Sequence, residues 1–415
     1  MVPLIVNALD IEGGAARAAY RLHKGLRRAG VHSQMLVQSK SSEDKDVIAL
    51  PGALSRIVGK RRPGLDARLA SVLSGGADKD FYPSMIPFSR MRKKIYELAP
   101  DIINLHWISG GMFRIEELAL LQQPLVWTFH DMWPFTGGCS YSRTCKRYVE
   151  KCGRCPQLKR AGDRDLSRKV FDRKSEAYSN LDITVVCPSN WLADKARESS
   201  LFGSRVINVI PYGLDLDTYR PAQNESVRSA WNLPREVPLI LFGAVGATSD
   251  KRKGFDLLQR TLESLRASSI ERVELVIFGA NRPRTDPNLF FPSTYVGNIS
   301  DESRLSQLYS AADVTVLPSR DDNLPNVAIE SLACGTPVAG FDTGGMTDII
   351  DHQVNGILAP PENPEALAAG IQWILEDRNR HRQLAKQARA AAVEKYSLEL
   401  QARRYAVLYQ QLLDR

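Results

Sequence analysis

Two acidic residues, Asp322 and Glu330, have the side-chain type and spacing that most clearly indicate chemistry. The apolar run Val314–Leu317 predicts a buried strand, and Asn326–Ala333 predicts a helix that is apolar on nearly all sides. Glu330 lies in the middle of this helix, and a buried carboxylate is costly unless hydrogen-bond donors satisfy it. Its partner is therefore either an internal Arg or Lys, or the ribose hydroxyls of a bound nucleotide.

Asp322 lies in the loop 319–325, directly after the predicted strand. In a parallel α/β sheet, ligands bind at the carboxyl ends of the strands. The start of the following helix adds unpaired backbone N–H groups, which suit an anion or sugar hydroxyls. We therefore expect a sugar to contact Asp322 and the backbone of Asn323, Leu324, Pro325 and Asn326.

A cluster of cations, Lys251, Arg252 and Lys253, precedes a predicted helix at 255–266. Lysine supplies a point charge and arginine a planar fork, so cations before a helix N-terminus suit a diphosphate group. Lys253 is the first candidate for this contact, and Arg252 is the second. A basic loop that is merely exposed to solvent is the alternative.

The elements that must position these residues begin with a predicted strand at 3–8, a loop that ends in Gly13 and Gly14, and a helix. Glycines allow backbone N–H groups to approach a phosphate or a sugar closely. The spacing is not the GxGxxG fingerprint, so a tight turn without a ligand explains these glycines equally well. The strand–turn–helix order itself predicts the start of a doubly wound α/β domain.

Two histidines, His106 and His130, each stand at the end of a predicted strand, 100–107 and 125–129 respectively. Polar residues at strand ends of a parallel sheet are placed where ligands bind. A structural role is the simpler reading of either histidine taken alone.

Four cysteines with the spacing C-x5-C-x6-C-x2-C follow: Cys139, Cys145, Cys152 and Cys155. In a protein that we expect to be cytoplasmic, such a group reads better as a metal site than as disulfides. Four thiolates suit tetrahedral zinc in a closed, structural site. Reduced thiols or a redox pair are the alternatives.

The composition of the chain limits which class of protein it can be. The chain has 415 residues, 43% of them hydrophobic and 25% charged, which indicates an ordinary globular protein of two domains. No apolar run reaches the ~18 residues of a membrane span, and no signal peptide is recognisable, so a cytoplasmic location is predicted. The segment 39–89 lacks periodicity and is expected to hold loops and short helices that contact the acceptor.

The net charge is +8, and basic residues cluster within 56–68 and 90–94. No nucleic-acid-binding motif accompanies this charge, so we expect no nucleic-acid partner. A solvated surface is the usual explanation of such runs. The alternative is attraction to phosphate-bearing substrates or peripheral contact with the anionic inner face of the cell membrane.

The stretch 318–338 resembles the signature of GT-B glycosyltransferases of family four, in particular those of exopolysaccharide or colanic-acid type. That family carries two acidic residues and then a Gly-Thr-Pro-Val turn, matched here by Glu330 and residues 335–338. Its first acid is usually Glu, whereas here it is Asp322. Lys253 with Gly254 matches the family's Lys-Gly. The family's preceding Arg is absent near Ala244 and Val245, and Arg252 is the candidate to replace it.

The resemblance implies two Rossmann-like domains facing a cleft, at 1–212 and 213–396, with a terminal helix at 397–415 packing back onto the first domain. It implies transfer of a sugar from a nucleotide-diphosphate sugar, the co-substrate, to a hydroxyl acceptor with retention of configuration. The acceptor is expected to be a lipid-linked glycan or another saccharide of the cell envelope.

The resemblance also implies roles for individual residues. Glu330 holds the ribose, and Lys253, with Arg252 or the loop at Gly13 and Gly14, neutralises the diphosphate. His130, in the segment 128–131, contacts the transferred sugar. No catalytic metal is expected. Three alternatives remain: a nucleotide-sugar 2-epimerase on the same fold, a hydrolase that uses an acidic pair, and a non-catalytic nucleotide-binding protein.

Overall fold

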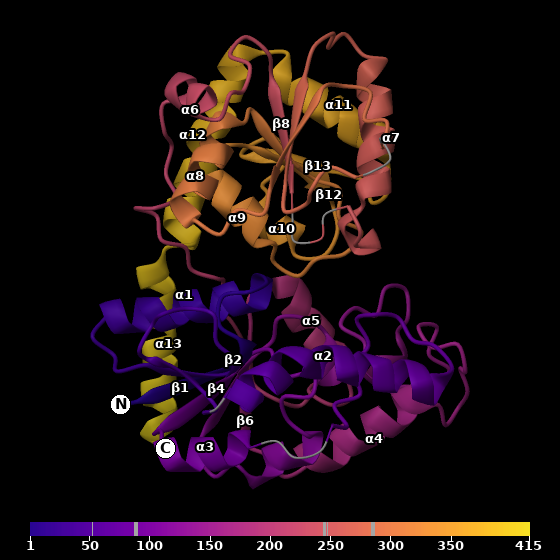
Figure 1. The fold of residues 1–415 in the computed structure, drawn as a ribbon, viewed down its shortest axis with the longest axis vertical. Coiled ribbons are helices and arrows are strands. Elements are labelled where there is room, and N and C mark those ends of the chain that lie inside the picture. The colour runs from indigo at the N-terminus through magenta and orange to yellow at the C-terminus, as the bar shows by residue number, and fades with distance from the viewer. Residues whose placement is uncertain (52, 87–89, 244–245, 247, 284–286) are drawn as a thin grey trace. The chain divides into compact units, whose positions relative to one another are not determined.

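The computed structural model describes residues 1–415 except 52, 87–89, 244–245, 247 and 284–286. The chain divides into two compact units. In Figure 1 the first is coloured indigo to magenta, together with the yellow C-terminal end of the chain, and the second is coloured from red to yellow. The first unit is Met1–Pro211 with Gln401–Arg415, and the second is Tyr212–Leu400. The sequence also predicts a helix at 89–98 and a strand at 239–244. Ser89 in the first, Ala244 in the second and Val245 lie outside the described residues.

The first unit is built on a parallel sheet with the strand order β3-β2-β1-β4-β5-β6-β7. Its strands are β1 (Pro3–Leu9), β2 (Gln34–Ser39), β3 (Val47–Ala49), β4 (Ile102–Leu105), β5 (Leu125–Thr128), β6 (Ile183–Cys187) and β7 (Ile207–Val209). Its helices are α1 (Gly14–Arg28), α2 (Ala53–Ser74), α3 (Met91–Leu98), α4 (Leu166–Tyr178) and α5 (Asn190–Glu198).

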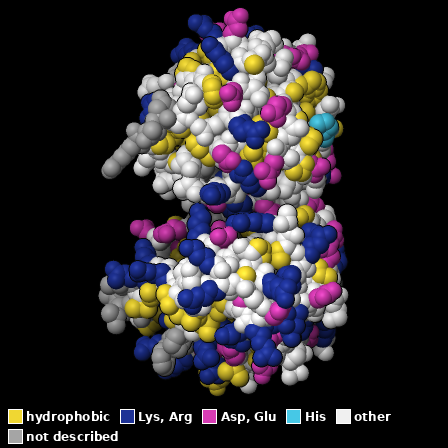
Figure 2. Space-filling model, turned by 90° about the vertical axis from the view of Figure 1, so that its right-hand side faces the viewer, with side chains coloured by type: hydrophobic (Ala, Val, Ile, Leu, Met, Phe, Trp, Pro, Cys, Tyr) yellow, Lys and Arg dark blue, Asp and Glu magenta, His cyan; other side chains and the backbone are white. Residues whose placement is uncertain are grey.

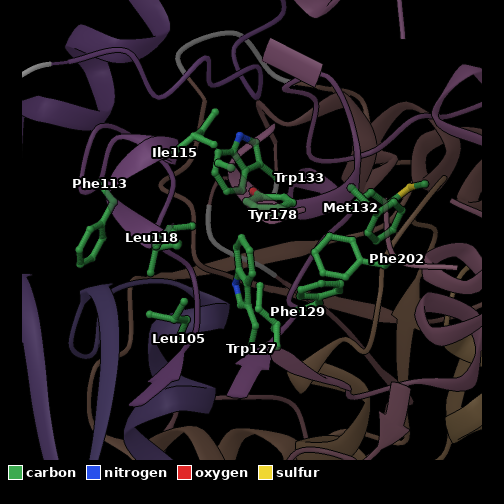
Figure 3. Close-up of a cluster of buried hydrophobic side chains, with 14 of the residues drawn as sticks. Leu105, Phe113, Ile115, Leu118, Trp127, Phe129, Met132, Trp133, Tyr178 and Phe202 are labelled. Carbon is green, nitrogen blue, oxygen red and sulfur yellow. The ribbon is translucent and has the colours of Figure 1, made fainter. Parts of the chain in front are cut away.

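Successive side chains of each central strand point to opposite faces of the sheet, so they pack into two separate hydrophobic cores. On β5, Trp127 faces one core and Val126 the other. Figure 3 shows Trp127 and Phe129 packed among Trp133, Tyr178 and Phe202 in the first of these cores. Buried aromatic packing therefore fixes the end of β5, which carries His130.

The second core is closed by the helix α13 (Leu398–Leu413), whose residues from Gln401 onward belong to the first unit. Two of its tyrosines, Tyr405 and Tyr409, are completely buried. The side chains of Thr128 and Tyr405 hydrogen-bond at 2.9 Å, and Asn104 donates to the Tyr409 hydroxyl at 2.7 Å. The last helix of the chain thus binds directly to the two central strands β4 and β5.

The segment 39–89 was predicted to be largely irregular, and this was wrong. It forms the short strand β3 and the 22-residue helix α2. Pro63 and two glycines lie within α2, and these residues normally break a helix. Gly59 is needed because a Cβ there would lie 2.5 Å from the carbonyl oxygen of Gln38, so the helix packs directly on β2.

The second unit is a parallel sheet with the strand order β10-β9-β8-β11-β12-β13. Its strands are β8 (Leu239–Gly243), β9 (Glu274–Phe278), β10 (Ser293–Gly297), β11 (Val314–Leu317), β12 (Val338–Phe341) and β13 (Gly356–Ala359). Its helices are α6 (Asn224–Ala230), α7 (Phe255–Arg266), α8 (Glu302–Ala311), α9 (Asn326–Ala333), α10 (Met346–Ile349), α11 (Pro364–Leu375) and α12 (Arg378–Lys395).

In this unit α7 and α11 lie together on one face of the sheet, and α8, α9 and α12 lie on the other (Figure 1). β11 lies between β8 and β12 at the centre, where the strand order reverses. Such a switch point leaves a crevice at the carboxyl ends of the strands. The loop after β11 carries Asp322, so the topology places this residue where the fold binds ligands. Over the described residues, no helix is long and apolar enough to cross a membrane.

Candidate functional site

Glu330 is buried in α9, with 2% of its surface exposed. The hydroxyl of Tyr309, from α8, donates a hydrogen bond to its Oε2 atom at 2.9 Å. Burial and then the neighbouring carboxylate raise the pKa of Tyr309 well above its usual value, so the phenol keeps its proton. The sequence did not indicate Tyr309, because α8 lies earlier in the chain and the pairing is tertiary.

Asp322 is 8% exposed and is surrounded by groups that stabilise its charge. Lys253 lies 2.6 Å from Oδ2, Arg252 lies 3.4 Å from Oδ1, and the backbone N–H of Asn323 donates to Oδ1 at 3.1 Å. Burial alone would raise the pKa of Asp322, but the charges of Lys253 and Arg252 hold it below its usual value. The structure thus brings together four of the residues predicted to contact the donor.

The loop that carries the two cations is tied to the loop that carries Asp322. Arg252 donates to the carbonyl of Asp321 at 2.9 Å, and the backbone of Arg320 donates to the carbonyl of Arg252 at 2.8 Å. Gly254 has φ +71°, and a Cβ there would lie 1.9 Å from the carbonyl oxygen of Pro318. Only glycine permits this approach, which explains the Lys-Gly pair physically.

A third loop, which follows β12 and carries Gly344 and Gly345, contacts the same residue. Gly345 donates its backbone N–H to the carbonyl of Asp322 at 2.9 Å. Gly344 has φ +58°, and a Cβ there would lie 1.9 Å from that carbonyl oxygen. The segment after β12 therefore holds Asp322 in place through its backbone.

In the first unit, Gly13 precedes α1 with φ +96° and ψ 166°. A Cβ at Gly13 would meet nothing within 4 Å, so the backbone conformation, not crowding, requires glycine here. Asp10, in the same loop, is fully buried and accepts hydrogen bonds from the backbone of Ser41 and Ser42 at 2.7–3.0 Å. The loop at Gly13 and Gly14 is thus anchored to the segment after β2.

The two strand-end histidines contact each other. The Nδ1 atom of His106 lies 2.8 Å from the Nε2 atom of His130, and both side chains are buried. Burial lowers the pKa of His130 to about 3. Burial, and then the proximity of His130, lowers the pKa of His106 well below its usual value. Both rings are therefore neutral at neutral pH, and the pair was not foreseen from the sequence.

Asp131, next to His130, is a further buried acid that the sequence did not single out. It accepts hydrogen bonds from the indole of Trp107 at 3.2 Å and from the backbone of Trp133 at 2.8 Å. Burial raises the pKa of Asp131 to about 6, although these hydrogen bonds oppose the shift. The end of β5 therefore holds a neutral histidine beside a carboxyl group whose pKa burial raises.

The four cysteines of the predicted zinc site, Cys139, Cys145, Cys152 and Cys155, line one cavity of the first unit. All of them are unpaired thiols. Among the described residues, no group of three or more His, Cys, Asp or Glu side chains is placed so that it could hold a metal ion. The zinc site therefore stays a prediction.

Two family descriptions match the chain. Residues 12–218 match Glycosyltransferase Family 4, and residues 224–391 match Glycosyl transferases group 1. A D-inositol 3-phosphate glycosyltransferase of Xylanimonas cellulosilytica is 33% identical over 409 residues, covering 92% of this chain and 87% of that protein.

A second relative matches over a shorter stretch. It is a GDP-mannose-dependent alpha-(1-6)-phosphatidylinositol dimannoside mannosyltransferase of Mycobacterium tuberculosis, 29% identical over 55% of this chain and 58% of its own length. Among solved structures, a sucrose-phosphate synthase from Thermosynechococcus elongatus matches all of both chains with a TM-score of 0.73 at 21% identity. The chain therefore belongs to the family 4, group 1 glycosyltransferases, and its two parallel α/β units are those of the GT-B fold.

Proposed function

We propose that this glycosyltransferase moves a sugar from a nucleotide-diphosphate sugar to a hydroxyl acceptor with retention of anomeric configuration. The observation that carries the proposal is the group of Lys253, Arg252 and Asp322 at the switch point of the second sheet. Glu330 lies buried in the helix that follows the same loop. A cationic group and a carboxylate at such a point suit a diphosphate and a ribose.

The chemistry follows from where charge develops. As the bond between sugar and diphosphate breaks, negative charge builds on the leaving phosphate. Lys253 and Arg252 are fixed by the loops around them, so they stabilise that charge without reorganising. Asp322 keeps the two cations in place, and the backbone after it contacts the sugar hydroxyls. To His130 we assign contact with the transferred sugar, as a neutral group.

We propose a lipid-linked or polyol acceptor at an anionic membrane surface. The two relatives named above act on inositol-containing acceptors by their names. In α2, the exposed residues Val58, Arg61, Leu65, Arg68 and Val72 recur at helical spacing and form one stripe of apolar and basic side chains. Figure 2 shows basic side chains interspersed with hydrophobic ones on one face of the first unit. Such a surface suits anionic lipid.

The donor is tested by thermal unfolding with a panel of UDP-, GDP- and ADP-sugars. A ligand at ~100 times its Kd stabilises the folded state by roughly 2.7 kcal/mol. We expect one nucleotide to raise the Tm of the wild type and to have no effect on Lys253→Ala. Lys251→Ala, an exposed lysine of the same loop, is the matched control and should respond like the wild type. A panel without any response would contradict the donor site.

The reaction is then tested with the nucleotide-sugar identified. NMR of the product should show the anomeric configuration of the donor retained, and inversion would contradict the mechanism. Isomerised nucleotide-sugar formed without an acceptor would indicate a 2-epimerase. Binding without turnover on any acceptor would indicate a non-catalytic protein.

Flotation with vesicles tests the membrane contact. The protein should float with phosphatidylglycerol vesicles more than with phosphatidylcholine vesicles, and Leu65→Glu should abolish this binding.

A further inference from the structure

The cysteine segment is long and has almost no regular secondary structure. Between β5 and α4, residues 136–165 contain only a three-residue 3-10 helix, Arg147–Val149. Two isolated bridges, Ala77 with Leu158 and Phe81 with Cys139, connect the segment to residues 77–81. Irregular segments of this length are uncommon in compact domains unless they are functional or held by an additional interaction.

Cys139, Cys145, Cys152 and Cys155 all line one small cavity. Its volume is about 20 Å³, which is enough for a single water-sized occupant. Three of the cysteines are 7–8% exposed, and Cys145 is partly buried. Residues separated by as many as 16 positions therefore line one small cavity.

The backbone is shaped to bring the cysteines to this cavity. Gly153 has φ +148° and Arg154 has φ +44°, so the chain reverses between Cys152 and Cys155. A positive φ is unfavourable for arginine, and here the Arg154 side chain is fixed by Asp163 through two hydrogen bonds of 2.8 Å. The structure thus maintains an unusual turn that directs both members of the C-x2-C pair inward.

One backbone N–H group donates a hydrogen bond to a sulfur atom of the cluster. The N–H of Gly137 points at the Sγ atom of Cys152 at a distance of 3.2 Å. Gly137 cannot be replaced without disturbance, because a Cβ there would lie 2.4 Å from the carbonyl oxygen of Ser167 and 2.9 Å from Cys152. Hydrogen bonds of this kind orient metal ligands and stabilise charge on them.

A buried cation stands beside the cluster. Lys174 is completely buried, and its ammonium donates to the carbonyl oxygens of Trp133 and Thr136, the latter at 3.0 Å. It also lies 3.6 Å from the centre of the Trp133 ring. A buried ammonium is costly unless negative charge lies nearby. Cys139 and Cys152 are among the groups that interact with it electrostatically, together with Asp131.

We propose that Cys139, Cys145, Cys152 and Cys155 bind one structural Zn²⁺ ion as thiolates, with Lys174 as the buried counter-charge. Four thiolates and Zn²⁺ carry a net charge of about −2, which Lys174 partly offsets. On binding, the four thiols release their protons to solvent, and neither zinc nor sulfur changes its oxidation state. Among the described residues, no three of these side chains lie close enough together to hold a metal ion, so binding requires the thiols to turn toward one another inside the cavity.

The ion would hold the segment that follows the catalytic end of β5. Thr136 and Trp133 both contact Lys174, and Trp133 donates to Asp131 beside His130. Zinc binding would therefore stabilise the first unit and keep the β5 loop ordered. This inference does not depend on the identity of the nucleotide-sugar, because its test measures metal and thiols rather than transfer.

The test is elemental analysis of the full-length protein, purified without a metal-affinity tag. We expect about one zinc ion per chain. Cys139→Ser and Cys152→Ser should lose it. The matched controls Cys187→Ser and Cys334→Ser replace buried cysteines outside the cluster and should retain it. Wild type reconstituted with Co²⁺ should show the intense visible absorption of tetrahedral thiolate coordination.

A second measurement uses only the wild type, so it stays decisive if the cysteine variants fail to fold. The wild type is treated with a thiol-blocking mercurial in the presence of a zinc-sensitive dye, and zinc release should track modification of four thiols. Absence of zinc in the wild type would overturn the proposal. Disulfides between the four cysteines in mass spectra, or an iron content with the absorption of a cluster, would overturn it as well.

Discussion

The ammonium of Lys253 lies 2.6 Å from the carboxylate of Asp322, and both side chains are largely buried. The two residues were predicted to contact different parts of the donor, the diphosphate and the sugar. The structure instead joins the two side chains in one ion pair. Asp322 holds the ammonium of Lys253 in place, and the charge of Lys253 in turn favours the ionised form of Asp322 by lowering its pKa.

Replacing Lys253 by Ala should leave the carboxylate of Asp322 buried with less compensating charge. Breaking a buried ion pair in this way costs roughly 3–5 kcal/mol, so the free energy of unfolding in urea should fall by an amount of this order. The double variant Lys253→Ala/Asp322→Asn should recover most of that stability but no nucleotide affinity. Recovery of affinity in the double variant would show that Lys253 does not contact the nucleotide.

Replacing Tyr309 by Phe removes the hydroxyl that donates to Glu330. A buried hydrogen bond to a charged group contributes about 1.5–3 kcal/mol, so the variant should unfold at lower urea concentration. Nucleotide affinity should fall less than in Glu330→Ala, because the carboxylate remains available to the ribose. If Tyr309→Phe and Glu330→Ala lost the same nucleotide affinity, the carboxylate of Glu330 alone would not account for ribose binding.

The contact between His106 and His130 predicts that both residues affect turnover. His130→Ala should lower kcat strongly, and His106→Leu should lower it less, because it removes a group that orients the first ring. Nucleotide affinity should be unchanged in both, since the nucleotide is assigned to the second unit. His32→Ala, at an exposed position, is the control. A large loss of nucleotide affinity in His130→Ala would contradict this division of roles.

Asp131 predicts a pH dependence of stability. Its pKa in the folded protein is about 6, above the ~3.9 of an unfolded chain, so the folded state binds the proton more tightly. The stability that Asp131 contributes is therefore greatest below about pH 4 and is lost as the pH rises toward 6. Asp131→Asn should remove this part of the pH dependence of stability, and Asp182→Asn, at an exposed site, should not. The free energy of unfolding is measured in urea at a series of pH values. The same dependence on pH in the wild type and in Asp131→Asn would contradict the assignment.

The sequence predicted those parts of the fold that depend on local pattern. The apolar run of β11, the helix α9 behind it and the glycine turns are set by periodicity and backbone conformation, so they were placed correctly. Helix α2 was missed, because Pro63 and the glycines contradict a helix locally and only packing on β2 explains them. The short strands β3 and β13 were missed because three or four residues carry too little pattern.

For the candidate site, the sequence identified single residues but not their partners. Burial of Glu330 followed from the apolar helix around it, and the structure confirms that burial. The hydroxyl of Tyr309, the pairing of the two histidines and the proximity of Lys174 to the cysteines arise from residues distant along the chain. Such contacts are set by how strands and helices pack, which spacing within one segment does not reveal.

The central claim is that Glu330 holds the ribose of the donor nucleotide, and isothermal titration calorimetry tests it most directly. The nucleoside diphosphate identified in the panel is compared with its 2′,3′-dideoxy analogue, in the wild type and in Glu330→Gln. We predict that the wild type binds the ribose form at least ~10-fold more tightly, about 1.4 kcal/mol, and that Glu330→Gln loses most of this preference. Equal affinity of the wild type for both ligands, or an unchanged preference in the variant, would contradict the account.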